Sequence, residues 1–173
     1  MDTKIITKEP FGPRIGGEPH KVLFMLDDDT LLIARLFAQE VPEIGAGRVE
    51  IKGIARKAGY RSKLALGSQD ESIDCIAVCV GLRGCRIMNI VAALGNERID
   101  LIRWDDSAER LIANALQPAQ IERIVLQPAE HRATVLVRPD QLSLALGPGA
   151  WNRELASQLS GWQIEVEARE SGQ

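Results

Sequence analysis

The chain has 173 residues, of which 45% are hydrophobic and 26% charged, enough to bury the core of one medium domain or of two small ones. No apolar run approaches the roughly 20 residues of a membrane span, and the first residues, MDTKIITKEP, lack the apolar stretch of a secretory signal. Three cysteines cannot all pair within one chain, which disfavours a disulfide framework. We therefore expect a cytoplasmic protein without a membrane partner.

The total net charge of −3 disfavours a nucleic-acid partner, but the charges are unevenly distributed along the chain. Residues 45–105 carry 10 basic and 7 acidic side chains, a net charge of +3, whereas residues 119–173 carry 5 and 7, a net charge of −2. Six basic side chains in the first segment are opposed only by Glu50: Arg48, Lys52, Arg56, Lys57, Arg61 and Lys63. Such a cluster is typical of a solvated strand pair and equally of a surface that binds phosphates.

The first 20 residues are rich in glycine and proline, which predicts a loop. The spacing of apolar residues then predicts six elements: a helix at 31–40, strands at 48–56 and 61–68, helices with apolar stripes at 73–80 and 87–94, and a strand at 97–104. The sequence Gly81-Leu82-Arg83-Gly84 separates the two short helices. The predicted order is α-β-β-α-turn-α-β.

The second half of the chain predicts the same order again. Its elements are a helix capped by Ser107, strands at 121–126 and 133–139, a short helix at 141–146, a helix from Trp151 to Leu159, and a strand at 162–168. Gly81 and Gly147 are 66 residues apart, and Ile99 and Ile164 are 65 apart. A repeat of one supersecondary unit explains both spacings.

A Gly-x-x-Gly loop between two amphipathic helices, packed on a three-stranded sheet, is the design of the KH (K-homology) module. The loop clamps the backbone of about four nucleotides of single-stranded RNA. Glycine lets the chain approach the phosphates closely, and the helix that follows directs its free N–H groups at the anion. The repeated motif predicts an α+β fold with two tandem type II KH domains.

Four stretches of the chain resemble the tandem KH region of the bacterial transcription factor NusA: residues 40–66, 79–104, 111–126 and 138–166. The resemblance implies a first RNA-binding loop lined by Gly81, Leu82, Arg83, Gly84 and Arg86, and a second lined by Gly147, Pro148, Gly149, Trp151 and Asn152. Trp151 is expected either to pack against the neighbouring unit or to stack on a base. The basic strand pair is expected to extend the RNA path through Lys52, Arg56, Lys57, Arg61 and Lys63.

The chain also departs from that family, which has a polymerase-binding domain and an OB-fold domain before the KH pair. Both are expected to be absent, so residues 1–30 are interpreted as an N-terminal extension in which VLFML (22–26) is a remnant of the OB-fold. The first KH domain is then expected at 31–106 and the second at 107–173. The second loop reads Gly-Pro-Gly-Ala: Pro148 removes an N–H donor and Ala150 adds a Cβ, so we expect it to bind RNA more weakly than the first.

The resemblance implies a regulator of transcription elongation, termination or antitermination. Its expected partners are single-stranded RNA, as a nascent transcript or ribosomal RNA, and RNA polymerase or other elongation factors. Two alternatives stay open: a KH protein of ribosome assembly or RNA turnover, and a protein-interaction module derived from a KH pair. The cysteine spacing does not fit a zinc site, and neither His20 nor His131 has a nucleophile nearby in a known motif. We therefore expect no metal, no cofactor and no catalysed reaction.

Overall fold

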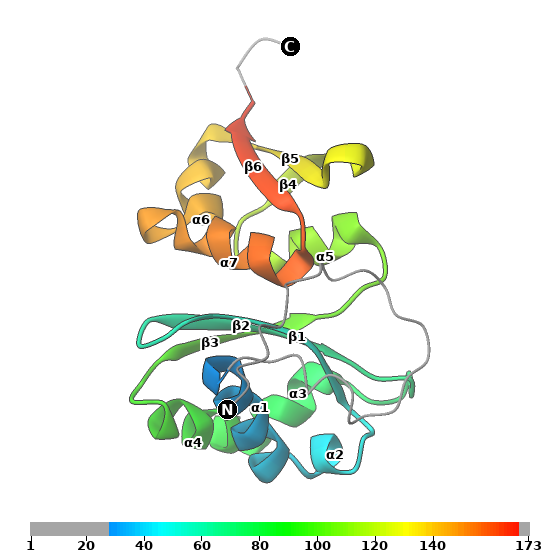
Figure 1. The fold of residues 1–173 in the computed structure, drawn as a ribbon, viewed down its shortest axis with the longest axis vertical. Helices are drawn as coiled ribbons and strands as arrows, with labels where there is room; N and C mark the ends of the chain where they lie inside the picture. Colours follow the sequence, from blue (N-terminus) through cyan, green and yellow to red (C-terminus); the bar gives the residue numbers. More distant parts are fainter. Residues whose placement is uncertain (1–27, 170–173) are drawn as a thin grey trace, which may run out of the picture.

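The computed structural model describes residues 28–169, which form two units stacked one above the other (Figure 1). The first unit contains α1 (Asp28–Glu40), α2 (Pro42–Gly45), β1 (Glu50–Lys57), β2 (Arg61–Gly67), α3 (Cys75–Val80), α4 (Cys85–Ala93) and β3 (Arg98–Arg103). The second contains α5 (Ala108–Ala115), β4 (Ile121–Gln127), β5 (Arg132–Val137), α6 (Leu142–Leu146), α7 (Trp151–Ser160) and β6 (Gln163–Ala168). Short 3-10 turns are η2 (Leu82–Gly84), η3 (Pro128–Glu130), η4 (Pro139–Gln141) and η5 (Pro148–Ala150). The predicted OB-fold remnant at 22–26 lies outside the described residues.

The repeated α-β-β-α-turn-α-β order is confirmed, with differences at several boundaries. Helix α1 begins at Asp28, three residues before the predicted start, because Asp28 and Asp29 in its first turn favour the positive end of the helix dipole. Helix α2 was not predicted; it begins at Pro42, whose fixed φ suits a first helical position. The predicted helical position of Ile73 is wrong, since Asp74 caps α3 by accepting hydrogen bonds from the N–H groups two and three residues on.

Both sheets have the same topology, in which the second strand of each unit is central. Strand β1 runs antiparallel to β2, and β3 runs parallel to β2 at the other edge. Strands β4, β5 and β6 repeat this arrangement. In each unit the third strand is therefore an edge strand, and it lies beside the helix that precedes the glycine loop.

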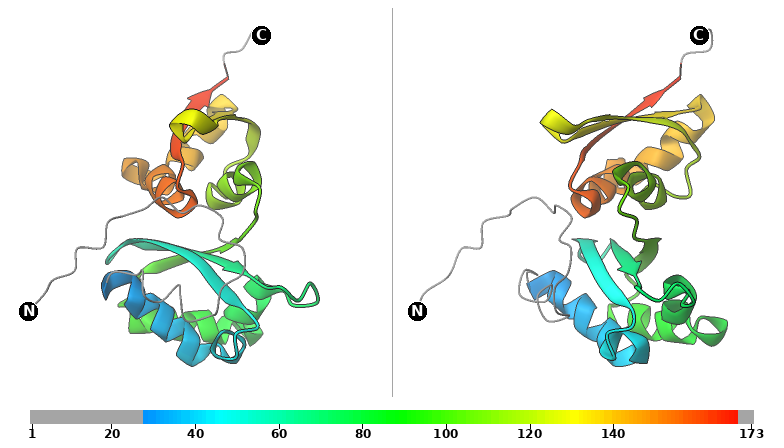
Figure 2. Two further views of the ribbon diagram at one scale, coloured as in Figure 1. Left: turned by 45° about the vertical axis from the view of Figure 1, so that its right-hand side comes forward. Right: turned by 90° about the vertical axis from the view of Figure 1, so that its right-hand side faces the viewer.

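Two cores hold the units together. In the first unit, one face of the sheet packs on α1, α3 and α4 through buried side chains that include Ile33, Phe37, Leu64 and Ile90. The opposite face packs on α5 and α7, so helices of the second unit lie between the two sheets (Figure 2). Residues of the first sheet, residues of α5 and α7, and residues of the second sheet form one buried cluster, which includes Ala65, Ile102, Leu111, Leu155 and Val135. The continuous core fixes the orientation of the two units.

Small residues allow this close packing. A Cβ on Gly53 of β1 would lie 3.3 Å from Cδ1 of Leu159 in α7. Ala55 and Ala65 lie on the same face of the sheet and are buried against the second unit. Because the shared core is apolar, cutting the chain at the predicted division between 106 and 107 would expose it, and that division stays a prediction.

Contrary to the expectation from the sequence, the 19-residue stretch Cys75–Ala93 is long and apolar enough for a membrane span by length and composition alone, with a mean hydropathy of 1.6. It is instead two short helices, α3 and α4, separated by a turn in which Arg83 and Gly84 have left-handed backbone angles. A membrane span needs one continuous helix of about 20 residues. The stretch therefore does not form such a helix in this structure.

Candidate nucleic-acid interface

The first glycine loop joins α3 to α4 through the turn η2. Gly81 has φ 76° and ψ 173°, and Arg83 and Gly84 follow with φ values of 54° and 75°. The N–H of Gly84 donates to the carbonyl of Gly81 at 3.0 Å, which closes the turn. A Cβ on Gly81 would lie 2.7 Å from Cγ of Arg86, so only glycine fits at the first position without a shift.

Arg86 braces this loop from inside the first turn of α4. Its Nη1 donates to the carbonyl of Val78 at 2.8 Å and to Oε2 of Glu43 at 3.0 Å. The first contact satisfies a carbonyl near the end of α3, where no further helical N–H follows. The predicted loop residue Arg86 thus lies at the loop, half-buried, with its guanidinium ion-paired to Glu43.

The tip of the first loop faces solvent. The side chain of Leu82 is 83% exposed, and Arg83 is also exposed. The N–H groups of the first turn of α4 have no acceptor within their own helix, and the helix dipole places positive potential there. An exposed cation and a helix N-terminus therefore lie at one surface, which is the arrangement that binds phosphate.

The second loop joins α6 to α7 through η5 and follows the same backbone path. Gly147 has φ 71° and ψ 171°, and Gly149 and Ala150 both have φ 60°. The N–H of Ala150 donates to the carbonyl of Gly147 at 3.0 Å, as in the first loop. The added Cβ of Ala150 is accommodated in the left-handed region, so the two loops differ in surface chemistry rather than in shape.

Asn152 occupies the position in the second loop that Arg86 occupies in the first. Its side-chain Nδ2 donates to the carbonyls of Leu144 (3.3 Å), Ala145 (3.0 Å) and Leu116 (3.2 Å). Only 2% of Asn152 is exposed, so the prediction of an RNA contact is corrected: its side chain holds the end of α6. The 66-residue offset aligned Arg86 with Asn152, but no feature of the sequence showed that Asn152 is buried.

Trp151 lies half-buried at the start of α7, between the two units. The Nζ of Lys57, the last residue of β1, lies 4.4 Å from the centroid of the Trp151 ring. Cδ1 of the same ring lies 3.2 Å from the place of a Cβ on Gly149. Trp151 was expected either to pack against the neighbouring unit or to stack on a base, and in the structure one face of its ring packs against the first unit.

Three members of the basic cluster are bound to carboxylates. Nε and Nη2 of Arg56 donate to Glu97 at 2.9–3.2 Å, and the Arg56 side chain is 9% exposed. Nε of Arg61 donates to Oδ2 of Asp100 at 2.6 Å, with 11% of the side chain exposed. Lys63 donates to the same oxygen at 2.9 Å and has no exposed side-chain surface.

The expectation that these three side chains extend the RNA path is therefore corrected. Their guanidinium and ammonium groups neutralise the buried carboxylate of Glu97 and the half-buried carboxylate of Asp100, and they are largely shielded from solvent. Lys52 is half-buried and forms an ion pair with Glu50. Lys57 remains exposed at the end of its strand, and it is the member of the cluster that lies next to a glycine loop.

Burial and pairing shift the pKa values of these groups. Burial alone would raise the pKa of Glu97, but hydrogen bonds from Arg56, Ser62 and the N–H of Gly59 hold it below its ordinary value. Burial would likewise raise the pKa of Asp100, and Arg61 and Lys63 lower it. The pKa of Lys63 is lowered, because burial outweighs the attraction of Asp100. Both carboxylates are therefore charged in the folded protein at neutral pH.

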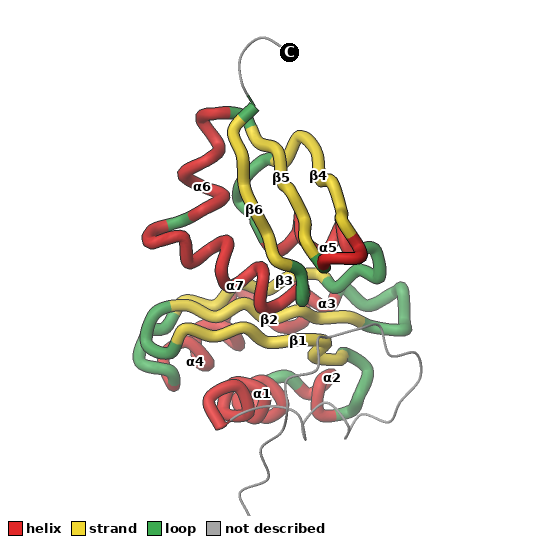
Figure 3. The backbone as a smooth tube through the Cα atoms, turned by 45° about the horizontal axis from the view of Figure 1, so that its top comes forward, coloured by secondary structure: helices red, strands yellow, loops and turns green. Residues whose placement is uncertain are grey.

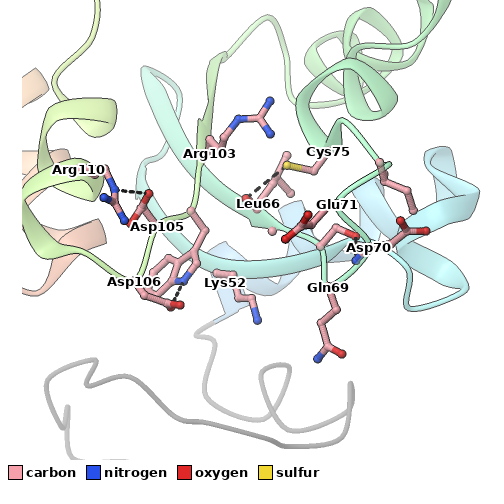
Figure 4. A pocket seen from close by; sticks show the side chains of 14 residues that line it. Lys52, Leu66, Gln69, Asp70, Glu71, Cys75, Arg103, Asp105, Asp106 and Arg110 are labelled. Atoms are coloured by element: carbon pink, nitrogen blue, oxygen red, sulfur yellow. Dashed lines mark hydrogen bonds and ion pairs between the residues drawn. The ribbon is translucent and has the colours of Figure 1, made fainter.

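An open pocket lies at the end of the first sheet remote from the β1–β2 turn (Figure 4). Its basic side chains are paired with carboxylates: Lys52 with Glu50, Arg103 with Asp74, and Arg110 with Asp105. Four acidic residues also line it: Asp70, Glu71, Asp105 and Asp106. This balance of charge gives no net attraction for phosphates. Among residues 28–169 there is also no cluster of three or more His, Cys, Asp or Glu side chains that could hold a metal ion.

Comparison with known proteins identifies both units. Residues 27–104 match the family described as the NusA-like first KH domain, and residues 108–173 match the NusA-like second KH domain. The crystal structure titled APE1850 superposes with a TM-score of 0.58 at 22% identity, over 80% of this chain and 96% of that one. At this identity the likeness concerns the fold alone. The molecule is a tandem KH protein, and the predicted α+β fold of two type II KH domains is confirmed.

Curated relatives narrow the assignment. Proteins named transcription termination/antitermination protein NusA are 47% identical over 139 residues in Thermus thermophilus, 39% over 142 in Halalkalibacterium halodurans and 41% over 145 in Bacillus subtilis. These matches cover 80–82% of this chain and 36–39% of the relatives. The chain belongs to the NusA-like KH family. It spans little more than a third of the length of these relatives.

Proposed function

We propose that the chain binds single-stranded RNA, with the Gly81–Gly84 loop as the principal contact with the phosphate backbone. The observation that carries the proposal is the exposure of Leu82 and Arg83 at the N-terminus of α4, in a loop whose shape is fixed by glycine. The helix dipole and the Arg83 guanidinium both attract phosphate there. The half-buried apolar residues Ile76, Ile99 and Leu101, from α3 and the adjacent edge strand β3, provide surface for bases beside the loop.

The second loop contributes more weakly in this proposal. It has the shape of the first loop but lacks an N–H at Pro148 and a side chain at Gly149. RNA held by the first loop would reach the second at a high effective concentration, because the shared core fixes the distance between them. The two loops together would hold roughly eight nucleotides, at about four for each loop.

The biological role we propose is regulation of transcription elongation, termination or antitermination in the cytoplasm. The support is the name of the relatives, transcription termination/antitermination protein NusA. The nascent transcript is then the RNA partner, and RNA polymerase or other elongation factors are further partners. Co-purification tests this role: polymerase subunits support it, whereas ribosomal RNA with ribosome-assembly factors would favour the alternative.

The RNA contact is tested by replacing Leu82 and Arg83 together with Asp. Both side chains are exposed, so the variant is expected to fold, as checked by circular dichroism. Two carboxylates then face the phosphates, and affinity for a labelled single-stranded RNA of about 12 nucleotides should fall at least about tenfold. Fluorescence anisotropy at several salt concentrations gives both the affinity and the number of phosphates contacted.

A matched control is available on α1. Leu32 is 47% exposed, Arg35 is exposed, and replacing both by Asp makes the same change of charge and composition away from the loops. This control should bind RNA as wild type does. Equal affinity of the two double variants would contradict the proposal. Salt-independent affinity of the wild-type protein would favour a protein-interaction module instead.

A further inference from the structure

The second glycine loop has the backbone of an anion-binding turn but carries no cation of its own. Its third position is Gly149, where the first loop has Arg83, and Pro148 supplies no N–H donor. The nearest arginine in the following helix, Arg153, lies 3.7 Å from Glu154, which offsets its charge. A phosphate at this loop therefore needs a positive charge from elsewhere.

The first unit brings such a charge to the second loop. The turn between β1 and β2 lies directly beneath the α6–α7 junction (Figures 1 and 3). Lys57 is the last residue of β1, is exposed, and places Nζ 4.4 Å from the centroid of the Trp151 ring. Trp151 is the residue immediately after Ala150, and its ring lies against Gly149. The ammonium group, the ring and the loop are thus contiguous although they come from two units.

The turn that carries Lys57 is held rigidly. The N–H of Tyr60 donates to the carbonyl of Lys57 at 3.0 Å, and the N–H of Gly59 donates to the buried carboxylate of Glu97 at 2.9 Å. Arg56 completes this network from the neighbouring position on β1. The hydrogen bonds fix the backbone from which Lys57 projects, and the contact with the Trp151 ring places its ammonium group beside the loop.

We infer that Lys57 supplies, from the first unit, the phosphate-binding cation that the second loop lacks, and that Trp151 positions it. The inference rests on the proposed RNA-binding function and adds that the second site is composite. The ring uses one side of the ammonium group, and the three N–H donors of Lys57 leave others free for phosphate oxygens. A base cannot stack on the ring face that Lys57 covers, so Trp151 acts as a positioning residue.

The test uses the full chain and the same single-stranded RNA of about 12 nucleotides. Lys57→Gln should weaken binding about three- to tenfold and reduce the salt slope by roughly 0.7, the value of one lost phosphate contact. Arg35→Gln, which removes one exposed positive charge from α1, is the matched control and should change neither quantity. Trp151→Phe keeps an aromatic ring, so Lys57 should retain part of its contribution to RNA affinity. In Trp151→Leu that contribution should be lost.

A double-mutant cycle places the charge at one loop or the other. Pro148→Asp places a negative charge in the second loop, and in that background Lys57→Gln should cause little further loss of RNA affinity. In the background of the Leu82 and Arg83 double variant, Lys57→Gln should still weaken RNA binding. The inference is overturned if Lys57→Gln acts in the Pro148→Asp background but not in the Leu82 and Arg83 background, or if Lys57→Gln and Arg35→Gln bind RNA equally. Either result leaves the proposed RNA binding intact. A wild-type protein that binds no RNA overturns both the inference and the proposed function.

Discussion

The two glycine loops share one backbone conformation but expose different side chains. Gly81 and Gly147 have nearly the same backbone angles, and in both loops the residue five positions later occupies the space that a Cβ would need. Yet the exposed positions differ completely, Leu82 and Arg83 against Pro148 and Gly149. Folding thus requires only the first glycine and a pair of left-handed residues, whereas binding phosphate requires the side chains and N–H groups between them.

The two hairpins show a similar contrast. In the first unit the buried carboxylate of Glu97 receives hydrogen bonds from Arg56, Ser62 and the N–H of Gly59, which ties the turn to β3. In the second unit the residue 65 positions later is Trp162, whose ring lies 5.4 Å from that of His131 in the turn. The first hairpin is held by hydrogen bonds to a buried carboxylate. The second is held by ring packing and by exposed ion pairs of Arg132 with Glu130 and Glu165, so pH and mutation should act on the two differently.

The largest effect is expected from Glu97→Gln. The substitution removes the ionised carboxylate of Glu97 from the nearly buried guanidinium of Arg56, which should lower the free energy of unfolding by about 3 kcal/mol at neutral pH. The folded-state pKa of Glu97 lies below its ordinary value of 4.5. Its contribution is therefore complete above pH 4.5 and is lost as the pH falls through the folded-state pKa.

Urea denaturation at about pH 7 and at about pH 3 measures this difference. The difference in the free energy of unfolding between wild type and Glu97→Gln should be smaller at the acidic pH. Val135→Ala, which removes only buried apolar surface from the second unit, is the control, and its difference from wild type in the free energy of unfolding should not narrow. A gap for Glu97→Gln that is as wide in acid as at neutral pH would show that the ionised carboxylate is not what holds the hairpin.

A smaller effect is expected from alanine at the first glycine of each loop. Gly147→Ala and Gly81→Ala both force a Cβ into a left-handed position and into a 2.7 Å contact, at a cost of about 2–3 kcal/mol. Gly147→Ala should cost more, because its Cβ meets Cβ and the backbone N of Asn152, whereas Arg86 offers a flexible side chain. Thermal unfolding monitored by circular dichroism measures the order of the two costs. A Gly147→Ala variant as stable as wild type would contradict the close approach of Asn152 to Gly147.

The smallest effect on stability is expected from glycine substitutions at the left-handed, non-glycine residue of each loop, and these substitutions distinguish stability from RNA binding. Arg83 and Ala150 each hold a left-handed angle that favours glycine, so Arg83→Gly and Ala150→Gly should each stabilise the fold by about 0.5–1 kcal/mol. Only Arg83→Gly should weaken RNA binding, because it alone removes a charge. If both variants bound RNA like wild type, the exposed side chain of the first loop would not contact phosphate.

The sequence predicted the features that depend on local spacing. The 66-residue repeat and the glycine loops between apolar stripes identified both units and the order of their elements. The sequence did not predict that Arg61 and Lys63 are neutralised, because their common partner, Asp100, is brought beside them only by the parallel pairing of β2 with β3. A cluster of like charges in sequence therefore did not amount to a charged surface.

The sandwiching of α5 and α7 between two sheets also resembles a step in a repeat array. At matching positions the first sheet presents Ile102, buried against those helices, and the second presents exposed Glu167. Likewise Lys63 and Asp100 lie on the sheet face that packs on the second unit, whereas Thr134 and Glu165 occupy the same register on the outer face of the second sheet. In these terms the second unit resembles a capping repeat, because its outer sheet face carries polar side chains.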